Sequence, residues 1–178
     1  DIDIHAREIL RMRETLNESA ERRVAVLDPI RLVIENWPRS GTEGHEEMAE
    51  VPNHPQKPDW GKRQVPLSGE LWIEREDYQE VPPKGYFRLF PGNKVRLRYG
   101  YVVECTGATK DAAGRVTAVH CTYFPDSRSG TPGADQYKVK GNIHWVSARH
   151  AYATEVRLYD RLYKAAHPGS GGRDHIED

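Results

Sequence analysis

The pattern of apolar and polar residues changes from helical to strand-like along the chain. Within residues 3–16, apolar side chains recur three and four positions apart, at Ile9, Met12 and Leu16, and charged residues occupy most of the other positions. This spacing predicts a short amphipathic helix with one apolar face. From Ile30 onward, apolar and polar side chains alternate instead, which is typical of half-buried β-strands.

Alternating segments of strand length recur through the rest of the chain. They are residues 30–35, 70–74, 94–104, 115–124, 137–146 and 154–162. No helical pattern separates them, so the spacing predicts an all-β, antiparallel barrel or sandwich preceded by one helix.

Two segments between the predicted strands show no periodicity. Residues 38–68 hold five prolines and three glycines. A loop of this length is uncommon in a compact domain and is usually functional or mobile. We expect a long loop there and a second one, rich in Ser, Gly and Pro, at residues 125–135.

A turn signal at residues 110–114 predicts a β-hairpin. A hairpin centred there would place Cys105 and Cys121 nearly opposite each other. Two cysteines are too few for a disulfide scaffold. We therefore expect two reduced, half-buried thiols in a cytosolic protein.

Composition indicates a soluble globular protein. The 178 residues are 37% hydrophobic and 30% charged, which suits one domain with a modest core. The apolar runs are short, so we expect no membrane span and no secretory signal. Net charge is −1, so any surface for nucleic acid must come from a local cluster of cations.

Positive charge is concentrated in residues 84–101, which hold five basic residues and no acid, whereas residues 70–80 hold five acids and one arginine. Side chains alternate along a strand, so Lys94, Arg96 and Arg98 should project from one face, about 6.6 Å apart. Such a row could follow a phosphate backbone. The planar guanidinium could also hold a phosphate or a base edge with two hydrogen bonds.

Aromatic residues lie beside this row, at Tyr86, Phe87 and Phe90. They could stack on unpaired bases, as in proteins that read single-stranded RNA loops. The alternative is that the three cations are only the solvated face of an amphipathic strand.

Other candidate sites have weaker patterns. The spacing of His45, Glu46, Glu47 and His54 matches no zinc site, so a polar loop is the simpler interpretation.

Catalytic patterns are weaker still. We interpret His144 as a strand histidine rather than a base. A triad of Ser147, His150 and Asp160 lacks the Gly-x-Ser-x-Gly motif, and the chain has no nucleotide-binding loop motif. We expect no catalytic, cofactor-binding or metal-binding residue in this chain.

Several ordered stretches resemble the anticodon-binding region of glutaminyl-tRNA synthetases. They are Val26-Leu-Asp-Pro29, Leu32-Val-Ile-Glu-Asn36, Val51-Pro-Asn-His-Pro55, Lys57-Pro58, Gly61-Lys-Arg-Gln-Val-Pro66, Leu71-Trp-Ile-Glu74, Val95-Arg-Leu-Arg98, Val139-Lys-Gly-Asn-Ile-His-Trp-Val146 and Val156-Arg-Leu-Tyr-Asp-Arg-Leu162. Their order and spacing match along residues 15–165. Archaeal and eukaryotic-type glutamyl-tRNA synthetases look similar, but residues 63–66 and 139–146 look more like the glutaminyl branch.

The resemblance implies a class I synthetase in which two consecutive β-barrels follow the catalytic and helical domains and read the anticodon. Residues 1–20 would end the helical connector, residues 21–166 would form the proximal barrel, and residues 167–178 would be a flexible tail at the start of the missing distal barrel. The fold expected is thus an antiparallel, six-stranded, Greek-key-like β-barrel with a short N-terminal helix and long loops. The class I motifs His-Ile-Gly-His and Lys-Met-Ser-Lys-Ser are absent from this chain. ATP and Mg would therefore bind in a catalytic domain outside it, and the chain alone should be inactive.

The resemblance also implies which side chains contact RNA. Four positions match basic residues that contact the anticodon in the family, the charge pattern adds one lysine, and the neighbouring aromatic residues add one tyrosine. The predicted RNA-binding residues are Arg22, Arg88, Arg96 and Arg98, with Lys94 and Tyr86. At Gly85 and Phe87 the family has polar or basic residues, so no contact is carried over. The expected partner is tRNA for glutamine, bound by a cytoplasmic monomer. The alternatives are the glutamyl enzyme and a protein-interaction barrel.

Overall fold

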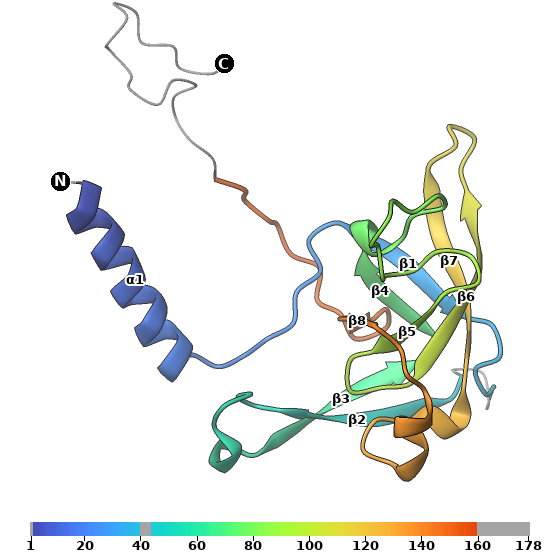
Figure 1. Ribbon diagram of the computed structural model, residues 1–178, viewed down its shortest axis with the longest axis horizontal. Helices are drawn as coiled ribbons and strands as arrows, with labels where there is room; N and C mark the ends of the chain where they lie inside the picture. The colour runs from blue at the N-terminus through green and yellow to red at the C-terminus, as the bar shows by residue number, and fades with distance from the viewer. Residues whose placement is uncertain (1, 40–43, 160–178) are drawn as a thin grey trace, which may run out of the picture.

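The computed structural model describes residues 2–39 and 44–159, which form one helix and two β-sheets (Figure 1). Helix α1 (Ile2–Ser19) confirms the predicted helix. The apolar face of α1 stays open, because Ile9, Met12 and Leu16 are each more than half exposed. This helix is not both long and apolar enough to cross a membrane, and the described residues hold no other candidate span.

The larger sheet contains seven strands in the order β8-β5-β6-β7-β1-β4-β9. Their bounds are β1 (Pro29–Ile34), β4 (Glu70–Glu74), β5 (Lys94–Leu97), β6 (Val102–Lys110), β7 (Val116–Tyr123), β8 (Gly141–Ile143) and β9 (Val146–Ser147). Only His144 and Trp145 separate β8 from β9, yet these two strands lie at opposite edges of the sheet. The sheet must therefore curl round until residues 141–147 join its edges.

The all-β architecture with an N-terminal helix is confirmed. The larger sheet alone has six strands when the interrupted β8–β9 run is counted as one, and two further strands form the smaller sheet. Strand direction differs in part from the purely antiparallel prediction. β1 pairs with β7 in parallel, and β5 pairs with β8 in parallel. Alternation shows which side chains face the core, but it carries no information on the direction of a neighbouring strand.

The prediction of an unbroken loop over residues 38–68 was wrong. β2 (Glu46–Pro52) and β3 (Lys62–Ser68) pair antiparallel along their whole length, and the 3-10 turn η1 (Pro58–Trp60) lies between them. Prolines at positions 52 and 66 masked the pattern. They are tolerated because each strand of a two-stranded sheet has a free edge, where a missing N–H removes no ladder bond.

The predicted strand over residues 94–104 is two strands, β5 and β6. A turn between them gives Tyr99 a positive φ of 63°, and the Leu97 amide donates to the Tyr101 carbonyl at 2.8 Å. Leu97 and Tyr101 are both buried. The alternation thus continues across the turn, and for this reason the pattern did not reveal it.

Strand predictions near the C-terminus were largely too long. Residues 137–146 contain β8 and only the start of β9. Residues 154–159 form no strand, and residues 160–162 lie outside the described residues. The predicted loop at 125–135 contains two 3-10 turns, η3 (Pro125–Ser127) and η4 (Pro132–Gln136).

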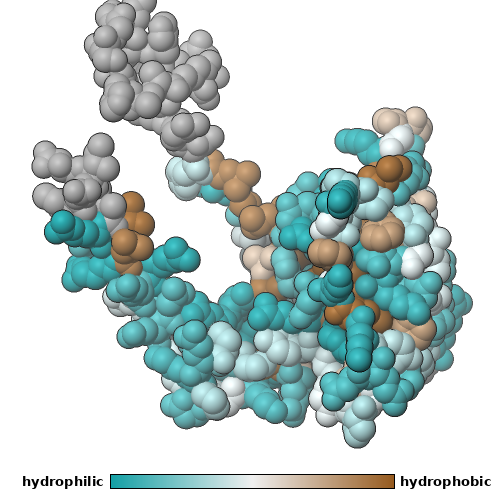
Figure 2. Space-filling model, in the orientation of Figure 1, coloured by the Kyte–Doolittle hydropathy of each residue, from teal (hydrophilic) through white to brown (hydrophobic). Residues whose placement is uncertain are grey.

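In the view of Figure 2 the barrel surface is mostly hydrophilic.

The core lies inside the curled sheet and is built from the inward side chains of its strands. Those less than 2% exposed include Ile30, Leu32, Leu71, Ile73, Val95, Leu97, Val103, Cys105, Val119 and Cys121. The predicted pairing of the two cysteines is confirmed, because Cys105 lies opposite Cys121 across β6 and β7. Both thiols are free and buried rather than half-buried.

Candidate nucleic-acid interface

A cationic pocket of about 370 Å³ lies between the segment after α1, the β2–β3 hairpin, the β5–β6 turn and the β8–β9 connection. We call it the arginine pocket. Its cations are Arg22, Arg23, Arg63, Arg98 and, when protonated, His144. Tyr99 and Trp145 add aromatic surface, and none of the described residues that line it is an acid. Such a pocket suits an anionic, planar ligand.

Arg22 is held at the rim of this pocket by the end of α1 and the β2–β3 connection. Its guanidinium donates to the Asn17 carbonyl at 2.7 Å and lies 3.1 Å from Nε2 of His54. His54 is buried and also contacts that carbonyl. The charge pattern of the sequence does not single out Arg22. Only the family resemblance predicts it as an RNA-binding residue.

Arg98 is the most available cation of the pocket. Its backbone is fixed on both sides, because its amide donates to Ile143 and its carbonyl accepts from the Trp145 indole at 3.0 Å. Its guanidinium carbon lies 5.3 Å from the centre of the Tyr99 ring. No ion pair joins it to a carboxylate of the described residues, so the charge is open to an incoming anion.

Arg88 lies outside the arginine pocket lining, in an acidic setting. It pairs with Glu76 at 2.8 Å and with the buried Asp77 at 3.1 Å. Burial raises the pKa of Asp77, while the charges of Arg88 and His144 oppose that rise. Neither Arg88 nor Asp77 lines the arginine pocket. The Arg88 charge is already partly compensated, unlike that of Arg98.

Tyr86 belongs to the same cluster. Its hydroxyl donates to the Glu76 carbonyl at 2.9 Å. Burial and the Asp77 carboxylate raise the pKa of Tyr86 to about 12. The phenol therefore stays neutral, and its hydrogen bond stabilises the 76–88 connection. Less of its ring is then available to stack on a base.

The other two predicted cations, Lys94 and Arg96, lie on the outer face of β5 and do not line the pocket. Val95 and Leu97 are buried, and Lys94 and Arg96 share the other face, as the alternation predicts for these two cations. Lys94 pairs with Glu104 at 3.5 Å and lies 4.7 Å from the Phe124 ring centre. Arg96 donates to the carbonyls of Ser127 and Ala134, each at 2.8 Å. The structure thus places Arg22 and Arg98 in the lining of one pocket and groups Arg88 and Tyr86 around Glu76. It leaves Lys94 and Arg96 outside the pocket lining.

Replacing Arg96 with alanine should destabilise the fold by about 1–3 kcal/mol, because two carbonyls in the 127–134 loop would lose a charged donor. Urea unfolding measures this loss. Replacing Arg115, an exposed arginine at the tip of the β6–β7 hairpin, controls for loss of charge. An unchanged midpoint for Arg96→Ala would show that these bonds contribute nothing.

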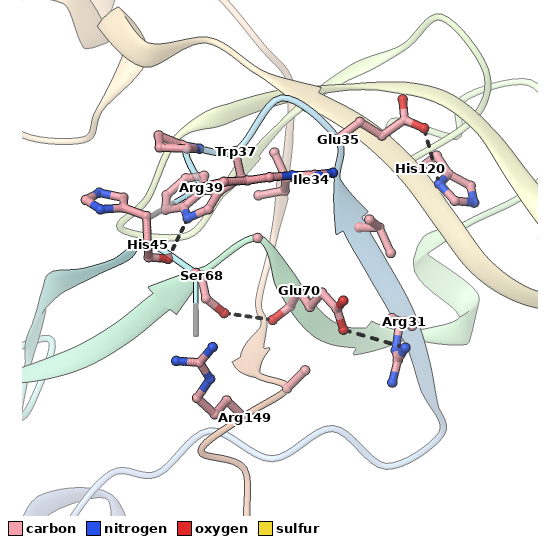
Figure 3. Close-up of a pocket in the computed structure, with 15 residues that line it drawn as sticks. Arg31, Ile34, Glu35, Trp37, Arg39, His45, Ser68, Glu70, His120 and Arg149 are labelled. Carbon is pink, nitrogen blue, oxygen red and sulfur yellow. Dashed lines mark hydrogen bonds and ion pairs between the residues drawn. The ribbon is translucent and has the colours of Figure 1, made fainter. Parts of the chain in front are cut away.

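A second pocket, of about 680 Å³, shares no residue with the arginine pocket (Figure 3). Arginines line it too, but they lie among acids: Arg31 pairs with Glu70 at 3.5 Å and His120 with Glu35 at 3.4 Å. None of the predicted RNA-binding residues lines it. Charges of both signs make it a weaker candidate for RNA.

The residues considered for a metal site have separate partners. His45 contacts Glu47 at 3.2 Å, and Glu46 contacts His150 at 2.7 Å. Within the described ranges, no three His, Cys, Asp or Glu residues gather as a metal ion requires.

The alternative triad has no support in the described residues. The Ser147 hydroxyl is buried without a partner there, and His150 contacts Glu46. Asp160 lies outside the described residues.

Comparison with known families assigns the chain. A family model described as "tRNA synthetases class I (E and Q), anti-codon binding domain" matches residues 20–124, more than half of the chain. The chain belongs to this family. A second model with the same description matches residues 142–177 of this anticodon-binding domain.

Curated relatives of this anticodon-binding domain carry the name glutamine–tRNA ligase. Identity is 62% over 166 residues with that of Cupriavidus taiwanensis, 56% over 165 residues with that of Bordetella pertussis, and 53% over 163 residues with that of Nitrosomonas europaea. These matches cover 93%, 93% and 92% of the chain but 28%, 27% and 29% of the relatives. The chain spans little more than a quarter of the length of the relatives it matches.

Proposed function

We propose that this domain recognises the anticodon loop of tRNA for glutamine as part of a glutamine–tRNA ligase. The observation that carries the proposal is the arginine pocket, where Arg22 and Arg98 meet although 75 intervening residues separate them in the chain. A convergence of arginines and aromatic rings suits single-stranded RNA, whose unstacked bases need both planar surfaces and phosphate contacts.

The side chains have distinct proposed roles. Arg98 contacts a base edge or phosphate inside the pocket, and Arg22 holds a second group at the rim. Arg88, oriented by Glu76 and Asp77, contacts the nucleotide next to the pocket, with Tyr86 packed behind it. Lys94 extends the positive surface along β5 toward neighbouring phosphates, and Arg96 positions the 127–134 loop beside it.

The remaining parts of the proposal concern the parent protein. Residues 1–20 would end a helical connector, residues 21–166 would form the proximal barrel, and residues 167–178, which lie outside the described residues, would begin a distal barrel. ATP and Mg would bind in the catalytic domain of the parent. The parent would be a cytoplasmic monomer, and the names of the relatives support the glutamine enzyme over the glutamate enzyme.

The proposed function predicts selective and salt-sensitive tRNA binding. Titration should show that tRNA for glutamine binds at least tenfold more tightly than the same tRNA with a substituted anticodon, because base contacts supply about 1–3 kcal/mol each. Affinity should also fall steeply with salt, since phosphate contacts release counterions. Equal binding of the two tRNAs would refute the proposal, and preferential binding of tRNA for glutamate would transfer it to the glutamate enzyme.

A further inference from the structure

An exposed phenylalanine, Phe87, precedes Arg88 in the chain and carries a lysine over its ring. Half of the Phe87 side chain is exposed, and the ammonium of Lys140 lies 4.8 Å from the centre of its ring. Lys140 thus lies over one face of the ring, and the exposed remainder of the ring surface is open to water. Neither the family resemblance nor the proposed roles above use this side chain.

The backbone that carries Phe87 is held in place. Strand β8 passes so close that a Cβ added to Gly141 would lie 2.0 Å from the Phe87 carbonyl oxygen. Leu89, two residues further, is fully buried, and the Tyr86 hydroxyl is bonded to Glu76. The ring therefore projects from an ordered segment, so that a ligand stacking on it would pay little cost in ordering the backbone.

One lysine lies over the ring, and two more lie near it in the sequence or in the same connection. Lys84 lies in the same connection, and Lys138 and Lys140 precede β8. None of these three forms an ion pair with a carboxylate of the described residues, whereas Lys110 pairs with Glu80 at 2.6 Å. An open ring with uncompensated lysines matches the needs of a single-stranded nucleotide, which offers a planar base and a phosphate.

We propose that Phe87 and Lys140 form a stacking site for one unpaired nucleotide of the anticodon loop. The base packs on the exposed surface of the Phe87 ring, and the Lys140 ammonium meets its phosphate. The site lies close in the chain to a residue of the arginine pocket, because His144 lines that pocket and follows Lys140 by four residues. This inference rests on the proposed function and adds a contact to it.

The test compares matched variants of the 178-residue chain in binding to tRNA for glutamine. Phe87→Ala should weaken binding about tenfold, because stacking on one aromatic ring contributes about that much. Phe87→Trp keeps a ring and should stay within about twofold of the original. Val81→Ala is the matched control, since Val81 is 86% exposed in the same connection and offers no ring to a base.

The cation and the stacked base need separate readouts. Lys140→Ala should reduce the slope of log affinity against log salt by about one, as expected for one lost phosphate contact. A 2-aminopurine placed in turn at each loop position should lose fluorescence on binding at one position, and Phe87→Ala should abolish that loss.

Two outcomes separate failure of this inference from failure of the proposed function. If the unmodified chain binds the tRNA selectively but Phe87→Ala behaves like Val81→Ala, the stacking site is wrong and the proposed function stands. If the unmodified chain shows no preference for the glutamine anticodon, the proposed function fails and the stacking site fails with it.

Discussion

Replacing Arg98 with alanine should weaken binding of tRNA for glutamine about 5- to 150-fold, which corresponds to about 1–3 kcal/mol. The guanidinium faces the arginine pocket, and no described carboxylate neutralises it. Its loss should therefore remove a charged contact to RNA without leaving a partner unsatisfied inside the protein. Titration by fluorescence anisotropy at fixed salt measures the effect.

Three controls make the Arg98 result specific. Arg115→Ala removes one exposed arginine from the tip of the β6–β7 hairpin and should change affinity less than twofold. Arg98→Lys should recover only part of the affinity, because lysine lacks the planar fork. Thermal unfolding of Arg98→Ala should match the unmodified chain. An unchanged affinity would remove Arg98 from the interface, and with it the central contact of the proposal.

Replacing Gly141 with alanine should destabilise the fold by about 3 kcal/mol or more. An added Cβ would lie 2.0 Å from the Phe87 carbonyl oxygen and 2.8 Å from a methyl of Val95. The first atom belongs to the backbone and cannot rotate away, so relief requires β8 to move away from the segment that holds Phe87. Overpacking of this kind costs about 1–3 kcal/mol and occasionally more, and the backbone clash places Gly141 at the upper end.

Urea unfolding monitored by tryptophan fluorescence measures the effect of Gly141→Ala. The matched control is Asn142→Ala, in the same strand at an exposed position, which should change stability by less than about 0.5 kcal/mol. Affinity for tRNA should also fall, because β8 positions both Phe87 and the amide of Arg98, which donates to Ile143. A midpoint equal to that of Asn142→Ala would show that the β5–β8 contact is loose.

Prediction from the sequence worked best where one strand has one buried face. The alternation of Ile30, Leu32 and Ile34 matches their burial in β1. The same rule placed Val95 and Leu97 inside and the cations of β5 outside. These results follow from the period of two in an extended chain, which is a local property.

The errors arose where distant segments change the meaning of a local pattern. Prolines at positions 52 and 66 suggested a loop, but the two strands that contain them pair with each other and with no third strand. The turn at Tyr99 was invisible because Tyr101 returns to the core on the same side as Leu97.

The candidate site divides in the same way. The sequence by itself determined which faces are buried and that positive charge gathers in residues 84–101. Only the tertiary structure decided which arginines are open to a ligand. Arg98 faces the pocket. Arg96 instead donates to two carbonyls of the 127–134 loop, and Arg88 pairs with two acids. Strand period is set by neighbouring residues, but the partner of a long charged side chain is set by which distant segment the fold brings within about 3 Å of it.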